Sequence, residues 1–195
     1  MSRPKEFDPE RALDRAVELF WRKGYEATSV QDLVETLGIN RSSLYGTFGD
    51  KHALYLAAID RYCREVVDPV AAELDAAASP KAAIRRQFLS IPERTAKRGG
   101  RRGCLLCNAA VERAPADEDV QAEVLGGLTQ LGAAFRRALT RARTAGEIPE
   151  SVAPRALADY LLSGYFGLVV LAKAGRPPAQ LRRTAELILA CLERR

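Results

Sequence analysis

Two short apolar patterns, separated by a glycine, constrain the fold of this chain more than any other feature of its sequence. In residues 30–37 the apolar side chains recur at helical spacing and form one stripe, made of Val30, Leu33, Val34 and Leu37. Gly38 follows directly, where a helix end favours a residue that tolerates positive φ. The pattern therefore predicts a helix that ends at Gly38 and a tight turn into a second helix.

The second helix is predicted over residues 41–48. Asn40 can cap it, because an asparagine side chain can accept from the free backbone N–H groups of a first turn. Leu44 and Phe48 lie four residues apart and can anchor the helix to the core. The other side chains face outward and are mostly small and hydrogen-bonding: Arg41, Ser42, Ser43, Tyr45, Gly46 and Thr47. Such a helix suits a phosphate-lined DNA groove better than burial.

The chain resembles the TetR family of one-component transcriptional regulators. The resemblance is carried by Ala16, Phe20, Gly24, Tyr25, Thr28 and Ser29, by the two short helices, and by the run from Leu44 to Lys51. It covers roughly the first quarter of the chain strongly. The segment from Gly103 to Asn108 is similar to a block in the ligand-binding half of one branch of that family. Cys107 departs from that block, where an aliphatic residue is usual.

The whole chain is predicted to be helical, because no segment alternates like a strand and Ala, Leu, Arg and Glu dominate. We expect about nine helices. The first begins at the cap Asp8 and ends at Gly24; the fourth is expected to run from the cap Asp50 to about residue 78, with distortion at Pro69. The resemblance implies a three-helix DNA-binding domain with a helix-turn-helix at 1–51. A helical ligand-binding and dimerisation domain would occupy 52–195.

The resemblance also assigns candidate DNA contacts. Tyr45 and Lys51 stand at positions associated with phosphate, and Thr28 is expected to cap the helix at 30–37 and to donate to phosphate. Arg41, Ser42, Ser43 and Thr47 are the candidates for base contacts, although Arg41 can also serve phosphate alone. The full predicted set is Thr28, Ser29, Arg41, Ser42, Ser43, Tyr45, Gly46, Thr47 and Lys51.

The net charge of +5 is not concentrated in the predicted DNA-binding domain. Residues 1–51 carry eight cations and nine anions, which sum to −1. The segment 38–49 nevertheless holds one arginine and no acid. A DNA phosphate interacts mainly with charges close to it, because salt screens distant ones. The basic excess lies at 81–102, where Lys81, Arg85, Arg86, Arg94, Lys97, Arg98, Arg101 and Arg102 face Glu93 alone. This run is either a solvated helix face or a nonspecific DNA contact near the DNA-binding domain.

The last two predicted helices, over about 154–174 and 179 to near the end, are apolar enough to need a cover. The simplest cover is the same pair from a second subunit, which would give a two-fold four-helix bundle. The predicted interface residues are Leu161, Gly164, Leu168, Leu181, Ala185, Ile188, Leu189 and Leu192. The alternative is that residues 154–174 form the core helix of a monomer.

An effector pocket is expected among the fourth to eighth helices, with aromatic and aliphatic walls and a few polar groups. The candidate lining residues are Tyr62, Phe88, Cys107, Asn108, Val111, Leu128, Phe135, Tyr160, Ser163 and Phe166.

Cys104 and Cys107 have thiol-pair spacing. A closed zinc site is disfavoured, because no second such pair exists and the single histidine, His52, lies far away in sequence. The two cysteines are then either small buried apolar residues or a redox or soft-metal switch, whose thiol pKa the nearby arginines and a helix N-terminus would lower. His52 is expected to be a surface or cap-adjacent side chain, or a phosphate contact when protonated.

These observations predict a homodimeric repressor that a small-molecule effector releases from a palindromic double-stranded DNA operator. The alternative within regulation is a thiol-based redox or soft-metal sensor that uses Cys104 and Cys107. An enzyme is disfavoured, because one histidine, no nucleophile motif and no phosphate-binding glycine loop leave little chemistry to assemble. A protein-interaction module would show no DNA affinity. We expect no cofactor, no metal and no membrane partner. A cytoplasmic location with reduced thiols is expected, because the most apolar stretch, residues 160–174, is too short to span a bilayer.

Overall fold

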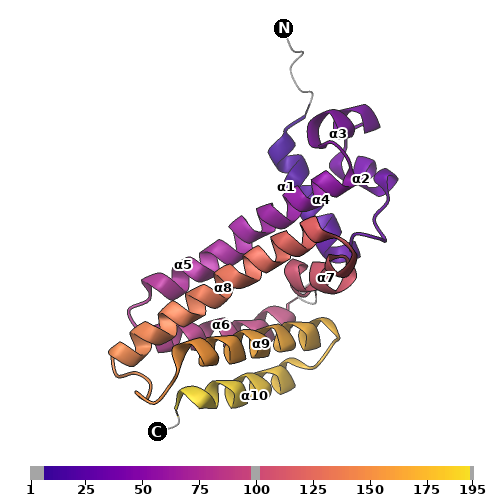
Figure 1. The fold of residues 1–195 in the computed structure, drawn as a ribbon. Coiled ribbons are helices and arrows are strands. Elements are labelled where there is room, and N and C mark those ends of the chain that lie inside the picture. The colour runs from indigo at the N-terminus through magenta and orange to yellow at the C-terminus, as the bar shows by residue number, and fades with distance from the viewer. Residues whose placement is uncertain (1–6, 98–101, 194–195) are drawn as a thin grey trace.

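The computed structural model describes residues 7–97 and 102–193, and within these ranges every regular element is helical (Figure 1). The all-helical prediction is thereby confirmed. The N-terminal helices are α1 (Pro9–Lys23), α2 (Val30–Leu37) and α3 (Arg41–Phe48), with the predicted bounds. Asp8 caps α1 by accepting from the backbone N–H groups of Glu10 and Arg11. Gly38 adopts the left-handed conformation (φ 70°) that ends α2.

The predicted fourth helix is interrupted. It consists of α4 (Lys51–Tyr62), a π-helical turn (Cys63–Val67) and α5 (Asp68–Ala76). In the π turn the backbone N–H of Asp68 donates to the carbonyl of Cys63, five residues earlier. Pro69 follows and has no N–H to donate to an α-helical ladder, so the wider turn lets the chain continue in helical form. The predicted distortion therefore occurs, but it lies before the proline.

The larger half of the molecule is built from the remaining helices: α6 (Pro80–Thr95), α7 (Leu105–Glu112), α8 (Glu118–Thr144), α9 (Pro154–Lys173) and α10 (Pro178–Leu189), with short 3-10 turns at Ala114–Ala116 and Ala190–Leu192. α8 extends along α5 on one side and along α6 and α9 on the other, and α10 covers α6 and α9 (Figure 1). The aromatic centre of this bundle is Phe88, Phe135 and Tyr165, with ring centroids 5.7–6.2 Å apart.

The N-terminal domain has its own aromatic core, and α4 shares it. The Phe20 ring of α1 lies 4.9 Å from the Tyr55 ring of α4, and Tyr55 lies 4.8 Å from Tyr25 in the α1–α2 loop. Tyr55 is fully buried, which raises the pKa of its hydroxyl. Because α4 packs on α1 before it continues towards α5 (Figure 1), this helix joins the two halves of the molecule.

Most of the α9 and α10 residues that were predicted to face a partner lie inside a single chain. Leu161, Leu168, Leu181, Ala185, Leu189 and Leu192 are fully or almost fully buried inside one chain. Gly164 and Ile188 are half-buried against each other, since a methyl group on Gly164 would lie 3.1 Å from Ile188. The apolar stripes read from the sequence are the inward faces, because α8 and α6 already cover them. The apolar side chains that stay exposed on these helices are Tyr160, Val170 and Leu187.

α9 also corrects the expectation that no segment is long enough to span a bilayer. By length and hydropathy alone, the 20 residues of Pro154–Lys173 meet the usual criterion for a membrane-spanning helix. One such helix is weak evidence, because the core helix of a water-soluble protein meets the same criterion. In this fold α9 packs one face against α6, α8 and α10 and leaves the other face exposed.

Candidate DNA-binding surface and effector cavity

α3 lies at one end of the molecule and is held by very few buried side chains (Figure 1). Leu44 is fully buried and anchors the helix, while Phe48 is half-buried. The Asn40 side chain accepts from the backbone N–H of Ser43 at 2.8 Å, as predicted for the cap. The outward face of α3 is therefore free to enter a groove.

The exposed residues of α3 are those that the sequence selected. Arg41, Ser42 and Gly46 are exposed, and 47 % of the Tyr45 surface is accessible. Ser43 and Thr47 are partly exposed. The Arg41 guanidinium lies 3.4 Å from the side-chain oxygen of Gln31 on α2. The sequence did not identify Gln31 as a neighbour of Arg41, because only the packing of α2 against α3 brings the two side chains together.

Two predictions about the start of α2 need correction. Thr28 is fully buried and its hydroxyl donates to the carbonyl of Gly24 at 2.6 Å, so its side chain is turned away from any DNA backbone. The cap of α2 is Ser29, which forms a reciprocal capping box with Asp32. The Asp32 carboxylate also lies 2.7 Å from Lys23, and this lysine together with Ser29 lowers the pKa of Asp32.

Lys51 lies at the start of α4, and its ammonium group stands 4.1 Å above the Tyr25 ring. Burial lowers the pKa of Lys51. The Arg113 guanidinium, from the segment after α7, lies 5.1 Å from the same ring. Cations from both halves of the molecule therefore pack on the Tyr25 ring. Lys51 is partly buried by this contact.

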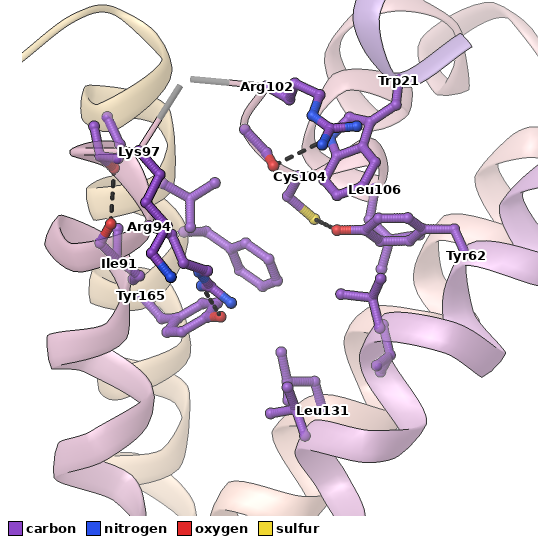
Figure 2. A pocket seen from close by; sticks show the side chains of 18 residues that line it. Trp21, Tyr62, Ile91, Arg94, Lys97, Arg102, Cys104, Leu106, Leu131 and Tyr165 are labelled. Carbon is purple, nitrogen blue, oxygen red and sulfur yellow. Dashed lines mark hydrogen bonds between the residues drawn. The ribbon is translucent and has the colours of Figure 1, made fainter. Parts of the chain in front are cut away.

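A cavity of about 310 Å³ lies between α1, α4, α6, α7, α8 and α9 (Figure 2). One wall carries Ile91 and Arg94 of α6 and Tyr165 of α9; the facing wall carries Trp21, Tyr62 and Cys104 (Figure 2). The volume is at the lower end of small-molecule sites. Trp21 belongs to α1, so a helix of the DNA-binding half forms part of the cavity wall.

The predicted pocket set matches this cavity only in part. Tyr62 and Phe166 line it. Phe88 and Phe135 are buried core behind it, and Cys107 and Asn108 lie on α7 outside its lining. Val111 (82 % exposed), Tyr160 and Ser163 face outward. Leu128 lies in a separate groove of about 330 Å³ between α8 and α9. The sequence identifies the apolar residues of a helix, but it does not identify the gap that packing leaves.

Trp21 is fixed by three contacts from distant parts of the chain. Its indole N–H donates to the carbonyl of Gly103 at 3.1 Å, and its ring lies 5.0 Å from that of Tyr62. Arg102 lies 4.8 Å above the indole and forms an ion pair with Glu18 of α1. Arg102 thus lies beside the DNA-binding half, as expected for the end of the basic run. Arg98 and Arg101 of that run lie outside the described residues.

Cys104 is the N-cap residue of α7 and lines the cavity. A hydrogen bond from the Cys107 thiol lowers the pKa of the Cys104 thiol to about 6, helped by Tyr62 and by the backbone N–H groups of Leu106 and Cys107 and opposed by burial. The Tyr62 hydroxyl donates to the Cys104 sulfur at 3.4 Å. The hydrogen bond that Cys107 donates to Cys104, followed by burial, raises the pKa of Cys107. The pair is therefore asymmetric, and Cys104 is the more acidic of the two thiols.

The far end of α7 holds the α1–α2 loop. The Glu112 carboxylate accepts from the backbone N–H groups of Tyr25 and Glu26, both at 3.0 Å. Arg113 forms ion pairs with Glu26 at 3.3 Å and with Asp117 at 3.0 Å. α7 therefore begins in the cavity wall and ends on the DNA-binding half.

His52 joins the same contact region and is not a free surface residue. Its Nε2 lies 3.0 Å from the Asp117 carboxylate at the start of α8. Asp119 is close enough to complete a set of possible metal-ligand atoms within 4.8 Å. Asp117, however, also accepts from Arg113 and from the backbone N–H of Val120, so this group is an ion-pair network that links α4 to α8.

The chain matches known regulators along nearly its whole length. Residues 12–58 match the family described as bacterial regulatory proteins, tetR family, and residues 80–188 match the tetracyclin repressor-like C-terminal domain. The HTH-type transcriptional regulator YezE of Bacillus subtilis (strain 168) is 36 % identical over 99 % of this chain and all of its own length. The HTH-type transcriptional repressor ComR of Escherichia coli (strain K12) is 31 % identical over 94 % of this chain and 88 % of its own.

A solved structure of a cysteine mutant of the TetR family transcriptional regulator CifR, in complex with 26-bp double-strand operator DNA, has the same fold. It superposes with a TM-score of 0.87 at 29 % identity and covers 98 % of this chain and all of that one. The exposed polar face of α3 in this chain and the operator complex of that relative both indicate DNA binding. The chain belongs to the TetR family of bacterial regulatory proteins and is a DNA-binding transcriptional regulator.

Proposed function

We propose that this protein is a homodimeric repressor, and that a small molecule bound in the cavity releases it from a palindromic operator. The observation that carries the proposal is the position of the cavity wall. Trp21 of α1 lines the cavity, and α7 extends from the cavity at Cys104 to the α1–α2 loop at Glu112. A ligand that moves either wall also moves the DNA-binding half, which is what an effector response requires.

The proposed DNA contacts are the exposed residues of α3 together with the start of α2. Arg41, Ser42, Ser43 and Thr47 would approach base edges, and Ser29, Tyr45 and Lys51 would position the helix on phosphates. Gly46 leaves open space, because a methyl group there would meet nothing within 4 Å. Two such helices in a dimer would read half-sites about 34–36 Å apart, one helical turn of DNA.

The proposed dimer uses the outward faces of α9 and α10. Tyr160, Val170 and Leu187 are exposed there, beside the small residues Ser163 and Gly167. Small residues allow a close approach of two helices, and the exposed apolar side chains would supply buried area in a two-fold four-helix bundle. Residues 1–51 and 52–195 remain our proposed domain division, with α4 as the connection, and we propose a cytoplasmic location.

A second candidate function is thiol sensing, which the asymmetric cysteine pair favours. A hydroperoxide would be attacked by the Cys104 thiolate, which gives a sulfenic acid and the leaving hydroxide or alkoxide. The Cys107 thiol would then displace the hydroxyl group of the sulfenic acid, which yields a disulfide and water. Because Cys104 is the N-cap residue of α7, this bond would alter the same helix that an effector would move.

The proposed function is tested by fluorescence anisotropy with the DNA upstream of the gene, at several salt concentrations and with competitor DNA. Saturable binding that competitor does not displace supports the proposal; no binding even at low salt contradicts it. Arg41→Ala should weaken operator binding by about 1–3 kcal/mol if Arg41 contacts a base, with Arg64→Ala of the exposed π turn as a control.

The thiol alternative is separated by Cys104→Ser and Cys107→Ser. If thiol sensing is the function, hydrogen peroxide should release DNA from the wild-type protein and not from either variant. Equal release from all three proteins would exclude the cysteine pair.

A further inference from the structure

The charged side chains that line the cavity are all cationic among the described residues. Arg94, Lys97 and Arg102 line it, and no aspartate or glutamate does so among the described residues. Arg102 is paired with Glu18, which lies outside the lining. Arg94 and Lys97 form no ion pair within the part of the chain that the structure describes. Two cations therefore face this space without a protein counter-charge.

Arg94 is the better placed of these two cations. Its guanidinium lies beside Tyr165 of α9 on the same wall of the cavity, where Nη2 lies 3.4 Å from the hydroxyl (Figure 2). This contact is long for a hydrogen bond, so it orients the guanidinium while leaving its donors available. A guanidinium binds a carboxylate through two parallel N–H donors, a geometry that an ammonium group cannot offer.

Apart from Thr95, Cys104 and the hydroxyl groups of Tyr62 and Tyr165, the rest of the lining is apolar or aromatic. Val66, Val67 and Val70 extend from the π turn into α5, Leu131 lies on α8, and Phe166 and Val169 lie on α9. These side chains offer no hydrogen-bond partner to a ligand. Burying polar ligand atoms against them would therefore be unfavourable. A ligand that fills the cavity must therefore combine a charged end with an apolar body.

Among the described lining residues, the Cys104 thiol is the one acidic group whose pKa is lowered. It already receives hydrogen bonds from Tyr62, from Cys107 and from backbone N–H groups of α7, and it lies on the wall that faces Arg94 (Figure 2). Even with a thiolate at Cys104, the three cations outnumber it. The lining therefore stays net positive.

We propose that the effector of this regulator is a hydrophobic organic carboxylate, with its carboxylate on Arg94 and its apolar body against the valines of the π turn and α5. The proposal rests on the proposed effector function and specifies the ligand class for it. A cavity of about 310 Å³ has roughly ten times the volume per molecule of liquid water, which suits a ligand on the order of ten to fifteen non-hydrogen atoms.

The test uses the fluorescence of Trp21, the single tryptophan of the chain, which lines the cavity. The intact protein is titrated with 4-phenylbutyrate, octanoate and hexanoate, and in parallel with the corresponding neutral amides. We expect at least one carboxylate to bind at least tenfold more tightly than its amide. That preference should diminish as sodium chloride rises from 50 to 500 mM, because salt screens the charge contribution alone.

Arg94→Gln should reduce carboxylate affinity to that of the amide. Arg85→Gln is the matched control, since Arg85 lies on the same helix but outside the cavity lining. Equal or tighter binding of the amides, or no binding of any carboxylate at 10 mM, would overturn the proposal.

The two proposals can fail separately. Specific operator binding by the ligand-free protein is measured by anisotropy on the same samples. If the protein binds operator but prefers neutral ligands, the ligand class is wrong and the regulator proposal stands. If carboxylates bind but operator affinity does not change, the ligand class stands and effector release is wrong.

Discussion

The Glu112 carboxylate accepts a hydrogen bond from the backbone N–H of Tyr25 at 3.0 Å, across a separation of 87 residues. Its other oxygen accepts from Glu26, so one side chain of α7 satisfies two N–H groups of the α1–α2 loop. A methyl group on Gly24 would lie 2.7 Å from the same carboxylate. Glu112 and the loop are thus fitted to each other, and this contact joins the cavity wall to the DNA-binding half.

Glu112→Ala should uncouple the two halves of the molecule. The amides of Tyr25 and Glu26 would lose their protein acceptor, so they should exchange hydrogen faster than in the wild-type protein. Hydrogen exchange resolved at residues 24–28, together with operator anisotropy, measures both effects. The response to ligand should shrink while some DNA binding remains. Glu123→Ala, an exposed acid on α8, is the control; an unchanged ligand response in Glu112→Ala would contradict the coupling role.

Gly24→Ala should destabilise the protein for two separable reasons. The residue has φ 85° and ψ 171°, a region that side-chain-bearing residues rarely adopt, with an expected cost of about 1–3 kcal/mol in unfolding free energy. The clash with Glu112 adds to this. In the double variant Gly24→Ala/Glu112→Ala, the substitutions should be less than additive in chemical denaturation. Gly146→Ala provides a glycine with positive φ (70°) and no neighbour within 4 Å. Full additivity in the double variant would show that the clash is not felt.

Leu161→Ala should lower stability, whereas Leu187→Asp should disrupt dimer assembly. Leu161 is fully buried in one chain, so its truncation should lower the unfolding free energy by about 2–5 kcal/mol. Leu187 is 75 % exposed in the single chain, so a charge there should leave the fold intact but dissociate a dimer. Thermal unfolding and sedimentation velocity distinguish the two. A Leu187→Asp protein that sediments like the wild-type protein would place the dimer surface elsewhere.

The reactivity of Cys104 should persist below neutral pH. Its pKa is lowered to about 6, so the rate of alkylation by iodoacetamide should be near its plateau at pH 7.5 and decline as pH falls through 6. Because this folded-state pKa lies below that of an unfolded cysteine, the thiolate contributes stability above the unfolded pKa and loses that contribution as pH falls towards 6.

A Tyr62 variant and a second cysteine, Cys63, test what lowers the pKa of Cys104. Tyr62→Phe removes one hydrogen bond to the Cys104 sulfur and should move the alkylation midpoint upward. Cys63 is the internal control, since burial raises its pKa to about 11 and should keep it unreactive in the same range. A midpoint near that of an ordinary thiol in the wild-type protein would contradict the proposed role of Cys104 as a sensor thiol.

The bounds and caps of α1, α2 and α3 could be predicted from sequence nearly to the residue, with Thr28 as the exception. Asn40 and Gly38 act on the backbone of their immediate neighbours, so their effect is visible in a few consecutive letters. Thr28 and Ser29 are both plausible caps on composition. Packing determines which of them is the cap. The buried Thr28 hydroxyl donates to the carbonyl of Gly24, whereas Ser29 forms the capping box with Asp32.

The sequence by itself determined that the chain is helical, where most helices begin and end, and that α3 carries an exposed polar face, because these properties follow from local caps and apolar periodicity. Only the tertiary structure decided what each apolar face contacts. Leu161 and Leu187 are both leucines on apolar helices, yet one is core and the other is surface. The cavity likewise exists only where Trp21, Arg94 and Cys104, distant in sequence, converge on a space that packing leaves unfilled.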